Sequence, residues 1–195
     1  MITNAAIAVI DETGLDGARL RDVARAGNVT TGAVTHYFDG KDAVLEAALE
    51  EIVRRTLARI DTPVDPETPG DVAAFIGRVC RYLPVDDDSR REWRVWLAFW
   101  GRAIADERLR AVHQDYYRAF VDRLAGHLQT LRNPAPKAST QMARACADAI
   151  MAAIDGVGTR ATLDPEEWPP KRQHETLTSL LMPMLTEFSN GTDSA

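Results

Sequence analysis

The segment over residues 20–38 concentrates side chains that could hydrogen-bond to a nucleic acid. It reads LRDVARAGNVTTGAVTHYF. Thr35 and His36 can exchange hydrogen bonds with phosphates or base edges, and the methyl groups of Ala33 and Thr35 could meet a thymine methyl. Tyr37 is suited to hold a phosphate from the flank of a helix. These groups can act together only if one short helix presents them outward.

Two short helices are predicted to position these groups, one over Leu20–Ala26 and one over Thr31–Tyr37. The break between them is Gly27-Asn28, and Asn tolerates left-handed backbone better than most residues. Small Ala24 lets the helices cross closely, and either member of the pair Thr30-Thr31 can cap the second helix. The apolar contacts between the helices come from Val23, Val29 and Val34. This pattern indicates a helix-turn-helix, whose second helix enters the major groove of DNA.

The segment resembles the TetR family of transcriptional repressors, and the resemblance extends beyond the motif. Residues 1–14 are similar to the family's first helix, and Phe38, Asp39-Gly40-Lys41-Asp42 and Leu45 are similar to its aromatic residue, short turn and fourth-helix start. The family docks as a dimer on two half-sites of DNA, with phosphates held by basic residues near the helix starts. Carried over by position, the resemblance implies DNA contacts at Arg19, Arg21, Thr30, Thr31, Gly32, Ala33, Thr35, His36, Tyr37 and Lys41.

Two positions depart from the family's pattern. Asn28 stands at the turn where relatives usually have Gly, and Thr35 stands where they often have Tyr, which removes an aromatic phosphate contact. The sequence opens directly into the first helix, so a basic arm is either absent or lies upstream of this start. Minor-groove contacts by such an arm are therefore not among the expected ones.

The rest of the chain also shows helical periodicity, and no segment alternates with period two for long enough to form a strand. The segment 62–70 is dense in Pro, Asp and Thr and reads as a linker. Pro183 lies inside the last helix and should kink it or remove one backbone bond. Further helices are expected near 70–83, 88–104, 106–132, 137–162 and 172–189. We therefore expect an all-α chain, with a three-helix helix-turn-helix DNA-binding domain over residues 1–46 and a larger helical ligand-binding and dimerisation domain over residues 47–195.

Aromatic residues gather in two of these helices. Trp93, Trp96 and Trp100 follow i, i+3, i+7 spacing and share one helix face. Two interpretations stay open: an aromatic core, or a mostly apolar pocket for a cationic or aromatic effector. Asp155 interrupts an apolar stretch and needs a partner, which could be an Arg, a helix-end hydrogen bond, or a cationic or hydroxylated ligand. The candidate effector residues are Trp93, Trp96, Phe99, Trp100, His113, Tyr116, Tyr117, Phe120 and Asp155.

Two stripes on the last two helices predict a homodimer interface. Small residues on the first allow close packing, and the second carries an apolar row. In the family, such helices build a four-helix bundle across a two-fold axis. The expected interface consists of Met142, Ala145, Ala149, Ala153, Leu177, Leu181, Met184, Leu185 and Phe188.

The C-terminal part is similar to one branch of the family, which includes the choline-responsive repressor of betaine synthesis. The similarity rests on WRVWLAFW over residues 93–100, AIDGV over 153–157 and LDPEEWPP over 163–170. It does not transfer choline as the ligand. The resemblance implies a repressor that a small-molecule effector releases from a palindromic operator of double-stranded DNA, with no cofactor and no catalysis.

The charge balance argues against a protein that coats nucleic acid through bulk positive charge. The formal net charge is −6, yet residues 19–41 hold four basic and two acidic side chains, and residues 28–38 contain no acid. A small local DNA contact surface therefore remains compatible with the composition. No apolar run approaches the roughly 20 residues that span a bilayer and no signal peptide is visible, so a cytoplasmic protein without a membrane partner is expected.

Two further groups of residues are compatible with other classes of function. Asp86-Asp87-Asp88 is similar to the aspartate clusters that hold magnesium diphosphate in all-α enzymes, but a charge cluster at a helix start is the better interpretation. Cys80 and Cys146 could form a redox sensor on the same scaffold, with Arg78 and Arg81 as the electropositive neighbours of Cys80. The cysteine spacing predicts neither a disulfide framework nor a metal site.

Overall fold

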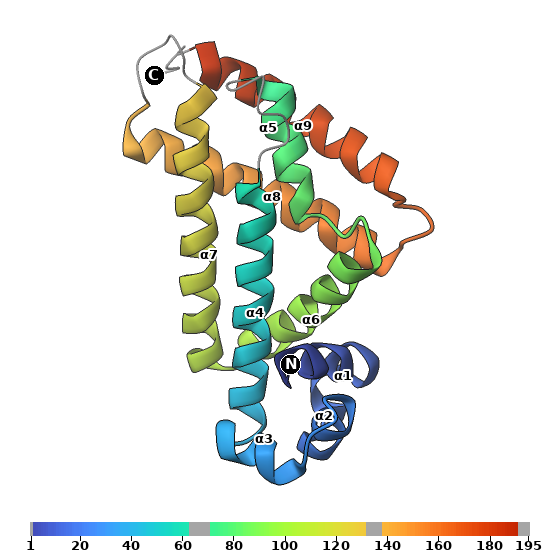
Figure 1. Ribbon diagram of the computed structural model, residues 1–195. Coiled ribbons are helices and arrows are strands. Elements are labelled where there is room, and N and C mark those ends of the chain that lie inside the picture. The colour runs from blue at the N-terminus through green and yellow to red at the C-terminus, as the bar shows by residue number, and fades with distance from the viewer. Residues whose placement is uncertain (1, 63–70, 132–137, 191–195) are drawn as a thin grey trace.

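The computed structural model describes residues 2–62, 71–131 and 138–190, which form helices and turns and no strand (Figure 1). The all-α expectation is confirmed. The helices in chain order are α1 (Ile2–Gly17), α2 (Leu20–Ala26), α3 (Thr31–Tyr37), α4 (Lys41–Asp61), α5 (Val72–Val79), α6 (Asp87–Ala103), α7 (Glu107–Leu128), α8 (Thr140–Leu163) and α9 (Pro170–Asn190), with short 3-10 turns η1 (Cys80–Tyr82) and η2 (Gln129–Leu131).

Helices α1, α2 and α3 gather around the start of α4 at the lower end of the molecule (Figure 1). The chain bends at Gly14, where φ is 68°, a value that glycine adopts without steric cost. The turn after the bend buries Leu15. Helices this short are not stable alone, so they are held by a shared core. That core contains Ala6, Ile7, Val23, Ala24, Val34, Val44 and Leu45.

The bounds, the turn and the cap of the helix-turn-helix are those that the sequence predicts. Helices α2 and α3 have the predicted bounds, and Asn28 is the only non-glycine residue in the described part of the chain with positive φ, at 51°. The Thr30 hydroxyl caps α3 by accepting a hydrogen bond from the backbone N–H of Ala33 at 3.1 Å. Val23 and Val34 are buried between the helices, and Val29 is half-buried against the same core.

Helix α4 belongs to both parts of the molecule. Its first turns bury Val44 and Leu45 against the N-terminal helices, and its later turns bury Ile52, Thr56 and Ile60 in the larger body. The boundary expected between residues 46 and 47 lies inside this continuous helix. Helix α4 therefore connects the two parts of the molecule directly.

The larger body is built from α5 to α9. Helices α7 and α8 pack against each other, α9 packs on α5 and α8, and α6 contacts both α1 and α8. Helix α8 crosses behind α4 and α7 (Figure 1). The predicted helices near 70–83 and 106–132 each end in a short 3-10 turn, and the others agree within a few residues. Of the predicted linker, residues 63–70 lie outside the described residues.

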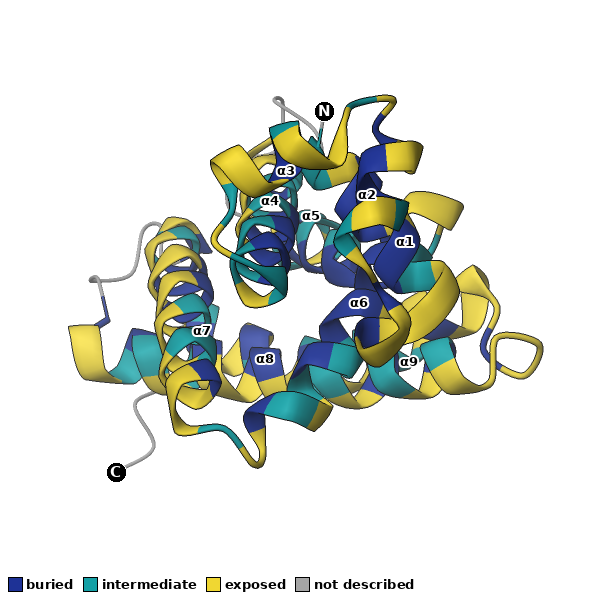
Figure 2. Cartoon of the chain, turned by 90° about the horizontal axis from the view of Figure 1, so that it is seen from below, coloured by how far each residue is buried: buried dark blue, intermediate teal, exposed yellow. Residues whose placement is uncertain are grey.

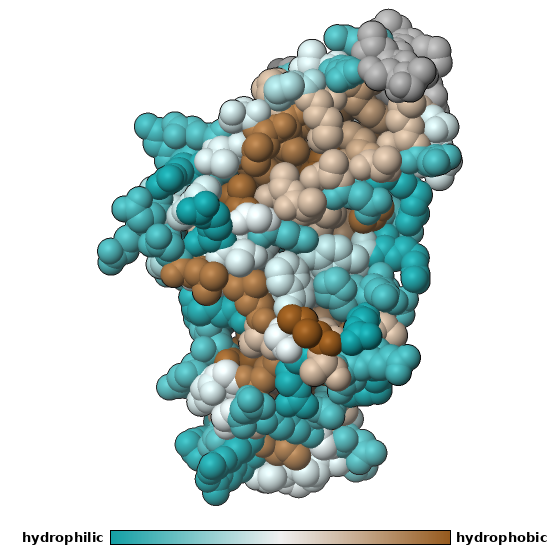
Figure 3. All heavy atoms as spheres, turned by 180° about the vertical axis from the view of Figure 1, so that it is seen from behind, coloured by the Kyte–Doolittle hydropathy of each residue, from teal (hydrophilic) through white to brown (hydrophobic). Residues whose placement is uncertain are grey.

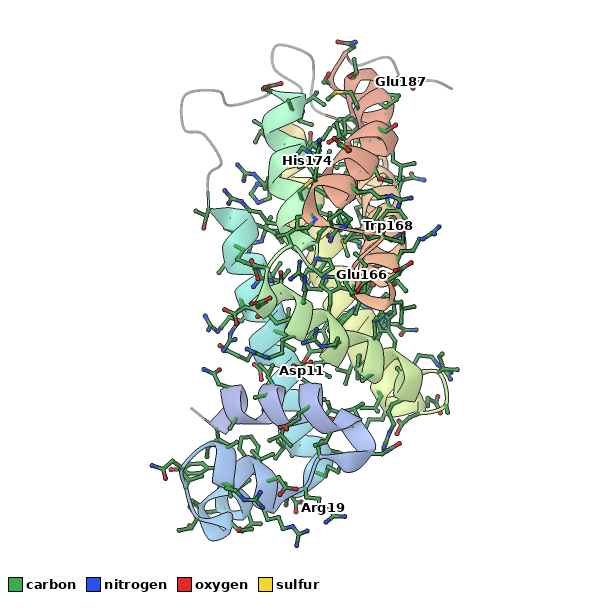
Figure 4. All side chains as sticks on the ribbon, turned by 90° about the vertical axis from the view of Figure 1, so that its right-hand side faces the viewer. Asp11, Arg19, Glu166, Trp168, His174 and Glu187 are labelled. Atoms are coloured by element: carbon green, nitrogen blue, oxygen red, sulfur yellow. The ribbon has the colours of Figure 1, made fainter. Side chains whose placement is uncertain are left out.

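Each helix carries its buried residues on the side that faces its neighbours (Figure 2). Helix α9 continues through Pro183, whose missing N–H removes one backbone bond without ending the helix. Trp168 lies in the α8–α9 connection (Figure 4), and the guanidinium groups of Arg160 and Arg172 lie over its ring, 4.8 and 4.7 Å from the ring centre. No helix in the described ranges is both long and apolar enough to cross a membrane.

Candidate functional site

Helix α3 presents the predicted polar groups on an outward face. Thr31, Gly32, Thr35 and His36 are exposed, and Tyr37 is 73% exposed. The Thr35 hydroxyl lies 3.2 Å from the carbonyl oxygens of Thr31 and Gly32, so it donates within the helix while its methyl and its lone pairs face solvent. Of the predicted set on this helix, Ala33 is half-buried.

The basic residues around α3 differ in exposure and in whether they already donate a hydrogen bond within the protein. Arg19 and Arg21 are exposed at the start of α2, and Arg19 projects from the lower end of the molecule (Figure 4). Lys41 is half-buried, and its ammonium donates to the backbone oxygen of Asp16 at 3.0 Å. It therefore ties α4 to the end of α1, which leaves two of its three N–H groups for a phosphate.

Four acidic residues of α1 and α4 pair with arginines of α6 and α7. Asp11 accepts from Arg94 at 3.0 Å and lies 3.5 Å from Arg91, and its carboxylate faces α6 (Figure 4). Asp16 pairs with Arg102 at 3.2 Å. In addition, Asp42 and Glu46 pair with Arg108 of α7. The network could not be predicted from the sequence, because its partners are distant in the chain.

A cavity between α4, α6, α7 and α8 lies in the larger body. Its volume is about 50 Å³, so it is a small cavity. Most of its wall is apolar and aromatic, with a few polar groups, which is typical of a small-molecule site. The lining residues are Ile52, Thr56, Arg59, Tyr82, Glu92, Trp93, Trp96, Tyr117, Phe120, Met151, Ile154 and Asp155.

Asp155 is an ionisable residue in the wall of this cavity. Its carboxylate accepts a hydrogen bond from the Tyr117 hydroxyl at 2.7 Å. Burial raises the pKa of Asp155 to about 6, although the Tyr117 hydrogen bond works in the opposite direction. Burial and the neighbouring Asp155 charge also raise the pKa of Tyr117, which keeps its proton. Among the described residues, Asp155 has a hydrogen bond from Tyr117 and no ion pair with a cationic side chain.

A second set of polar groups in the cavity wall comes from α4 and α6. Glu92 is buried, and its carboxylate accepts from Arg59 at 2.8 Å and lies 3.6 Å from Arg55. Arg59 also donates to the Thr56 hydroxyl at 3.0 Å. Thus the cavity wall is connected to the long helix that reaches the DNA-binding end. Glu92 precedes Trp96 by four residues, and this charged residue on an aromatic face was the signal that sequence analysis missed.

The structure separates the predicted effector residues into two groups. Trp93, Trp96, Tyr117, Phe120 and Asp155 line the cavity. Phe99, Trp100, His113 and Tyr116 do not line the cavity. The prediction that they belong to its wall is therefore corrected. Phe99 is fully buried in the core, and the His113 ring stacks 4.3 Å behind Tyr117, where burial lowers its pKa. The lining residues that the sequence did not identify are Ile52, Thr56, Arg59, Tyr82, Glu92, Met151 and Ile154.

The predicted dimer stripes are also divided. Leu177, Leu181, Leu185 and Phe188 are buried within the single chain, where α9 packs on α5 and α8, so they are not on a surface that a second copy could cover. The apolar row of α9 faces inward because it packs against α5, and this contact could not be predicted from the sequence. Ala145 and Ala149 are exposed, and Met142, Ala153 and Met184 are half-buried.

The residues behind the two other function classes have structural roles. The Asp86 side chain accepts from the backbone N–H of Ser89 at 2.7 Å in a capping box that begins α6. The part of the chain that the structure describes holds no group of His, Cys, Asp or Glu with metal-binding geometry. Burial raises the pKa of both Cys80 and Cys146 to about 11, which keeps these thiols protonated and poorly nucleophilic.

Two family descriptions match the chain. Residues 2–48 match the bacterial regulatory proteins of the tetR family, and residues 78–186 match the C-terminal domain of BetI-type transcriptional repressors. The HTH-type transcriptional regulator BetI of Vibrio parahaemolyticus is 27% identical over 97% of this chain and 92% of its own. The regulator of the same name from Burkholderia ambifaria is 32% identical over 83% of this chain and 80% of its own.

Solved structures show the same fold. A transcriptional regulator from Rhodococcus sp. Rha1 aligns with a TM-score of 0.79 at 27% identity, covering 100% of this chain and 97% of its own. A transcriptional regulator from Saccharomonospora viridis, solved in complex with choline, aligns with a TM-score of 0.76 at 21% identity over 93% of both chains. These relatives are named as regulators and not as enzymes.

Proposed function

This chain belongs to the TetR family of bacterial transcriptional regulators with a BetI-type C-terminal domain, and from that premise we propose that it is a homodimeric repressor which a small organic cation releases from its operator. Ligand-responsive repression by DNA binding is the function of this family. The observation that carries the choice of ligand is the buried carboxylate of Asp155 in an aromatic cavity. Because it acts on DNA, we place its activity in the cytoplasm.

The aromatic wall supports a cationic effector. Trp96 stacks 6.3 Å from Tyr117, and Phe120 meets Trp96 edge-on at 6.3 Å. Faces of such rings attract a cation once water is excluded, and a carboxylate beside them adds a full charge. Choline in the Saccharomonospora viridis regulator is a ligand of this class. A neutral aromatic effector would leave the Asp155 charge without a counter-charge.

For the DNA contacts, we assign α3 to the major groove. The exposed Thr35, His36 and Tyr37 would meet base edges and phosphates, while Arg19 and Arg21 would hold the backbone. Replacing Arg19 with Ala should lower the salt dependence of operator binding by about one counter-ion. A salt dependence that stays unchanged would remove Arg19 from the contact surface.

For the homodimer, we assign the outward face of α8 with the adjoining part of α9. This face joins exposed small residues to Leu180, which is 55% exposed, and the view from behind shows a broad apolar region over the upper half of the molecule (Figure 3). Small side chains let two helices approach closely, and a two-fold axis would bring the same face of each copy together. The residues of this face are Met142, Ala145, Ala149, Ala152, Ala153, Leu180 and Met184.

Coupling between the cavity and DNA would run through α4. Its residues Ile52, Thr56 and Arg59 line the cavity, while its first turn packs on the helix-turn-helix unit. A cation shifts the equilibrium only if it binds the DNA-released conformation more tightly. Since both recognition helices must dock at a fixed spacing, a small movement of α4 is enough to weaken the complex.

The test is operator binding with and without a cation. A duplex selected by the protein from a random pool serves as operator, and fluorescence anisotropy measures its dissociation constant at increasing choline concentration. We expect choline to raise that constant by about tenfold or more, within the usual range of coupling free energies. Operator binding that no quaternary ammonium compound changes would refute the cationic effector, and failure to select any duplex would refute the DNA assignment.

A further inference from the structure

The exposed face of α3 combines a missing side chain with a neighbouring methyl group. Gly32 and Thr35 are three positions apart, so they are neighbours on one face of the helix, and both are exposed. The first turn of α3 carries no acidic residue that would repel DNA. The two residues therefore form a small neutral surface, which we call the Gly32–Thr35 surface.

Thr35 presents its methyl group because its hydroxyl is turned toward its own helix. The hydroxyl lies 3.2 Å from the carbonyl oxygens of Thr31 and Gly32, which stand four and three residues earlier. A threonine in this rotamer directs its oxygen back along the helix, and its methyl group, on the other branch of Cβ, points away from those carbonyls. Since the hydroxyl proton is used within α3, the apolar branch is what Thr35 offers to an incoming base.

Gly32 is not required by the packing of the described part of the chain. Its backbone does not have the positive φ for which glycine is usually needed. A Cβ added there would meet only the Thr30 hydroxyl oxygen, at 3.8 Å, which is ordinary contact. Glycine in a helix lowers stability relative to alanine, so the fold alone would favour alanine at this position. The absent side chain instead leaves room for the close approach of a molecule from outside.

We propose that the Gly32–Thr35 surface reads a thymine in each half-site, with the C5-methyl group of the base over Gly32 and against the Thr35 methyl. This inference rests on the proposed DNA-binding function and names the base that one part of α3 recognises. Of the four bases only thymine carries a C5-methyl group in the major groove, so an apolar contact can distinguish it. Thr35 is then a specificity-determining residue that acts through its methyl group and not through its hydroxyl.

The test first removes the methyl group from the DNA. The duplex that the protein selects from a random pool is remade with deoxyuridine, which lacks the C5-methyl, in place of one thymine position at a time in both half-sites. Fluorescence anisotropy at one fixed salt concentration measures the dissociation constants. We expect one thymine position to raise the constant by about fourfold per half-site, the ratio that burial of one methyl group predicts.

Two substitutions of Thr35 then separate its methyl group from its hydroxyl. Thr35→Ser keeps the hydroxyl and removes the methyl, so it should weaken operator binding by about the same factor and lose the sensitivity to deoxyuridine at that position. Thr35→Val keeps the methyl and removes the hydroxyl, so it should bind and discriminate as the wild type does.

A substitution of Gly32 tests the close approach. Gly32→Ala should weaken operator binding, because its new methyl group would occupy the place of the thymine methyl. Gly126→Ala is the matched control, since Gly126 is exposed on α7 with open space around an added Cβ, and it should leave operator binding unchanged. Unfolding temperatures verify that each variant is folded.

The outcomes distinguish this inference from the proposed function. If the protein selects no duplex, DNA binding itself fails and the thymine contact fails with it. If it selects a duplex but deoxyuridine changes nothing, or if the sensitive thymine stays sensitive in Thr35→Ser, DNA binding stands and the thymine contact is overturned. A Thr35→Val variant that loses as much as Thr35→Ser also overturns it, because the hydroxyl would then be the reading group. Gly32→Ala binding as tight as that of the wild type would overturn the close approach at Gly32, and with it the proposed contact.

Discussion

Replacing Asp155 with Asn should remove most of the affinity for organic cations and make the remainder independent of pH. The substitution keeps the shape of the side chain and an oxygen that can accept from Tyr117, so it removes mainly the charge. A charge-assisted contact in a desolvated site contributes about 1.5–3 kcal/mol. The dissociation constant for choline at pH 7.5 should therefore rise by about 10- to 100-fold.

The pH dependence follows from the pKa of Asp155, which burial raises from 3.8 to about 6. Below pH 6 the wild-type carboxylate gains its proton, and at pH 5 only about one tenth is ionised, so cation affinity should be about tenfold weaker than at pH 7.5. For stability the sign is the reverse of the usual carboxylate case. The proton is bound more tightly in the folded state, so this contribution is present below about pH 4 and lost as the pH rises through 6. Removing the charge at pH 7.5 should therefore stabilise the fold, by up to about 3 kcal/mol.

Calorimetric titration of choline from pH 5 to 8 and chemical denaturation over the same range measure the two effects. Asp115→Asn is the matched control, because that carboxylate lies on the exposed side of α7, pairs with Arg118 and does not line the cavity. The control should leave affinity and its pH dependence unchanged. The reasoning is refuted if Asp155→Asn binds choline as the wild type does, or if the wild-type affinity is flat between pH 5 and 7.5.

Three further predictions concern the DNA face, the dimer and the cavity wall. Tyr37→Ala should raise the operator dissociation constant by about tenfold while changing the unfolding free energy by less than about 0.5 kcal/mol, since the side chain is 73% exposed; equal operator binding would exclude Tyr37 from the interface. Ala149→Glu should convert the dimer to a monomer in light scattering, because two copies would bury like charges; a dimer that persists would move the interface elsewhere. Gly158→Ala should destabilise the fold by about 1–3 kcal/mol, because its new methyl would stand 2.2 Å from the Trp93 ring. Gly101→Ala, with open space at the same position, should be neutral or stabilising by up to about 1 kcal/mol, and equal thermal shifts in the two variants would contradict this packing.

The helix-turn-helix could be predicted almost to the residue because its signals are local. Asn28 permits the left-handed turn, and the Thr30 hydroxyl caps α3 through an N–H three residues away. Interactions over such short separations depend little on the rest of the chain. The same holds for the capping box at Asp86, which explains an acidic cluster without a metal.

Which face of each long helix points to the core depends on the helix that packs against it. The sequence showed an apolar row on α9 but not that α5 would cover Leu177 and Leu181, so these residues were assigned to a dimer face and lie in the core. Likewise, helical spacing grouped Trp93, Trp96 and Trp100 correctly on one face, yet Trp100 lies beyond the cavity wall. Periodicity gives the face of a helix, whereas the neighbouring helix decides what that face meets.

By itself, the sequence determined an all-α chain, a DNA-reading unit and an aromatic region with one isolated carboxylate. Only the tertiary structure decided that Glu92 pairs with Arg59, which lies 33 positions earlier in the chain, and that Tyr82 lines the same cavity as Asp155. Among the described residues, the Tyr82 hydroxyl has no hydrogen-bond partner. The physical reason is that desolvation and charge pairing act through space between helices. Residue type and spacing show which groups can ionise or donate a hydrogen bond, but the packing of α4, α6, α7 and α8 determines which of them are left without a partner.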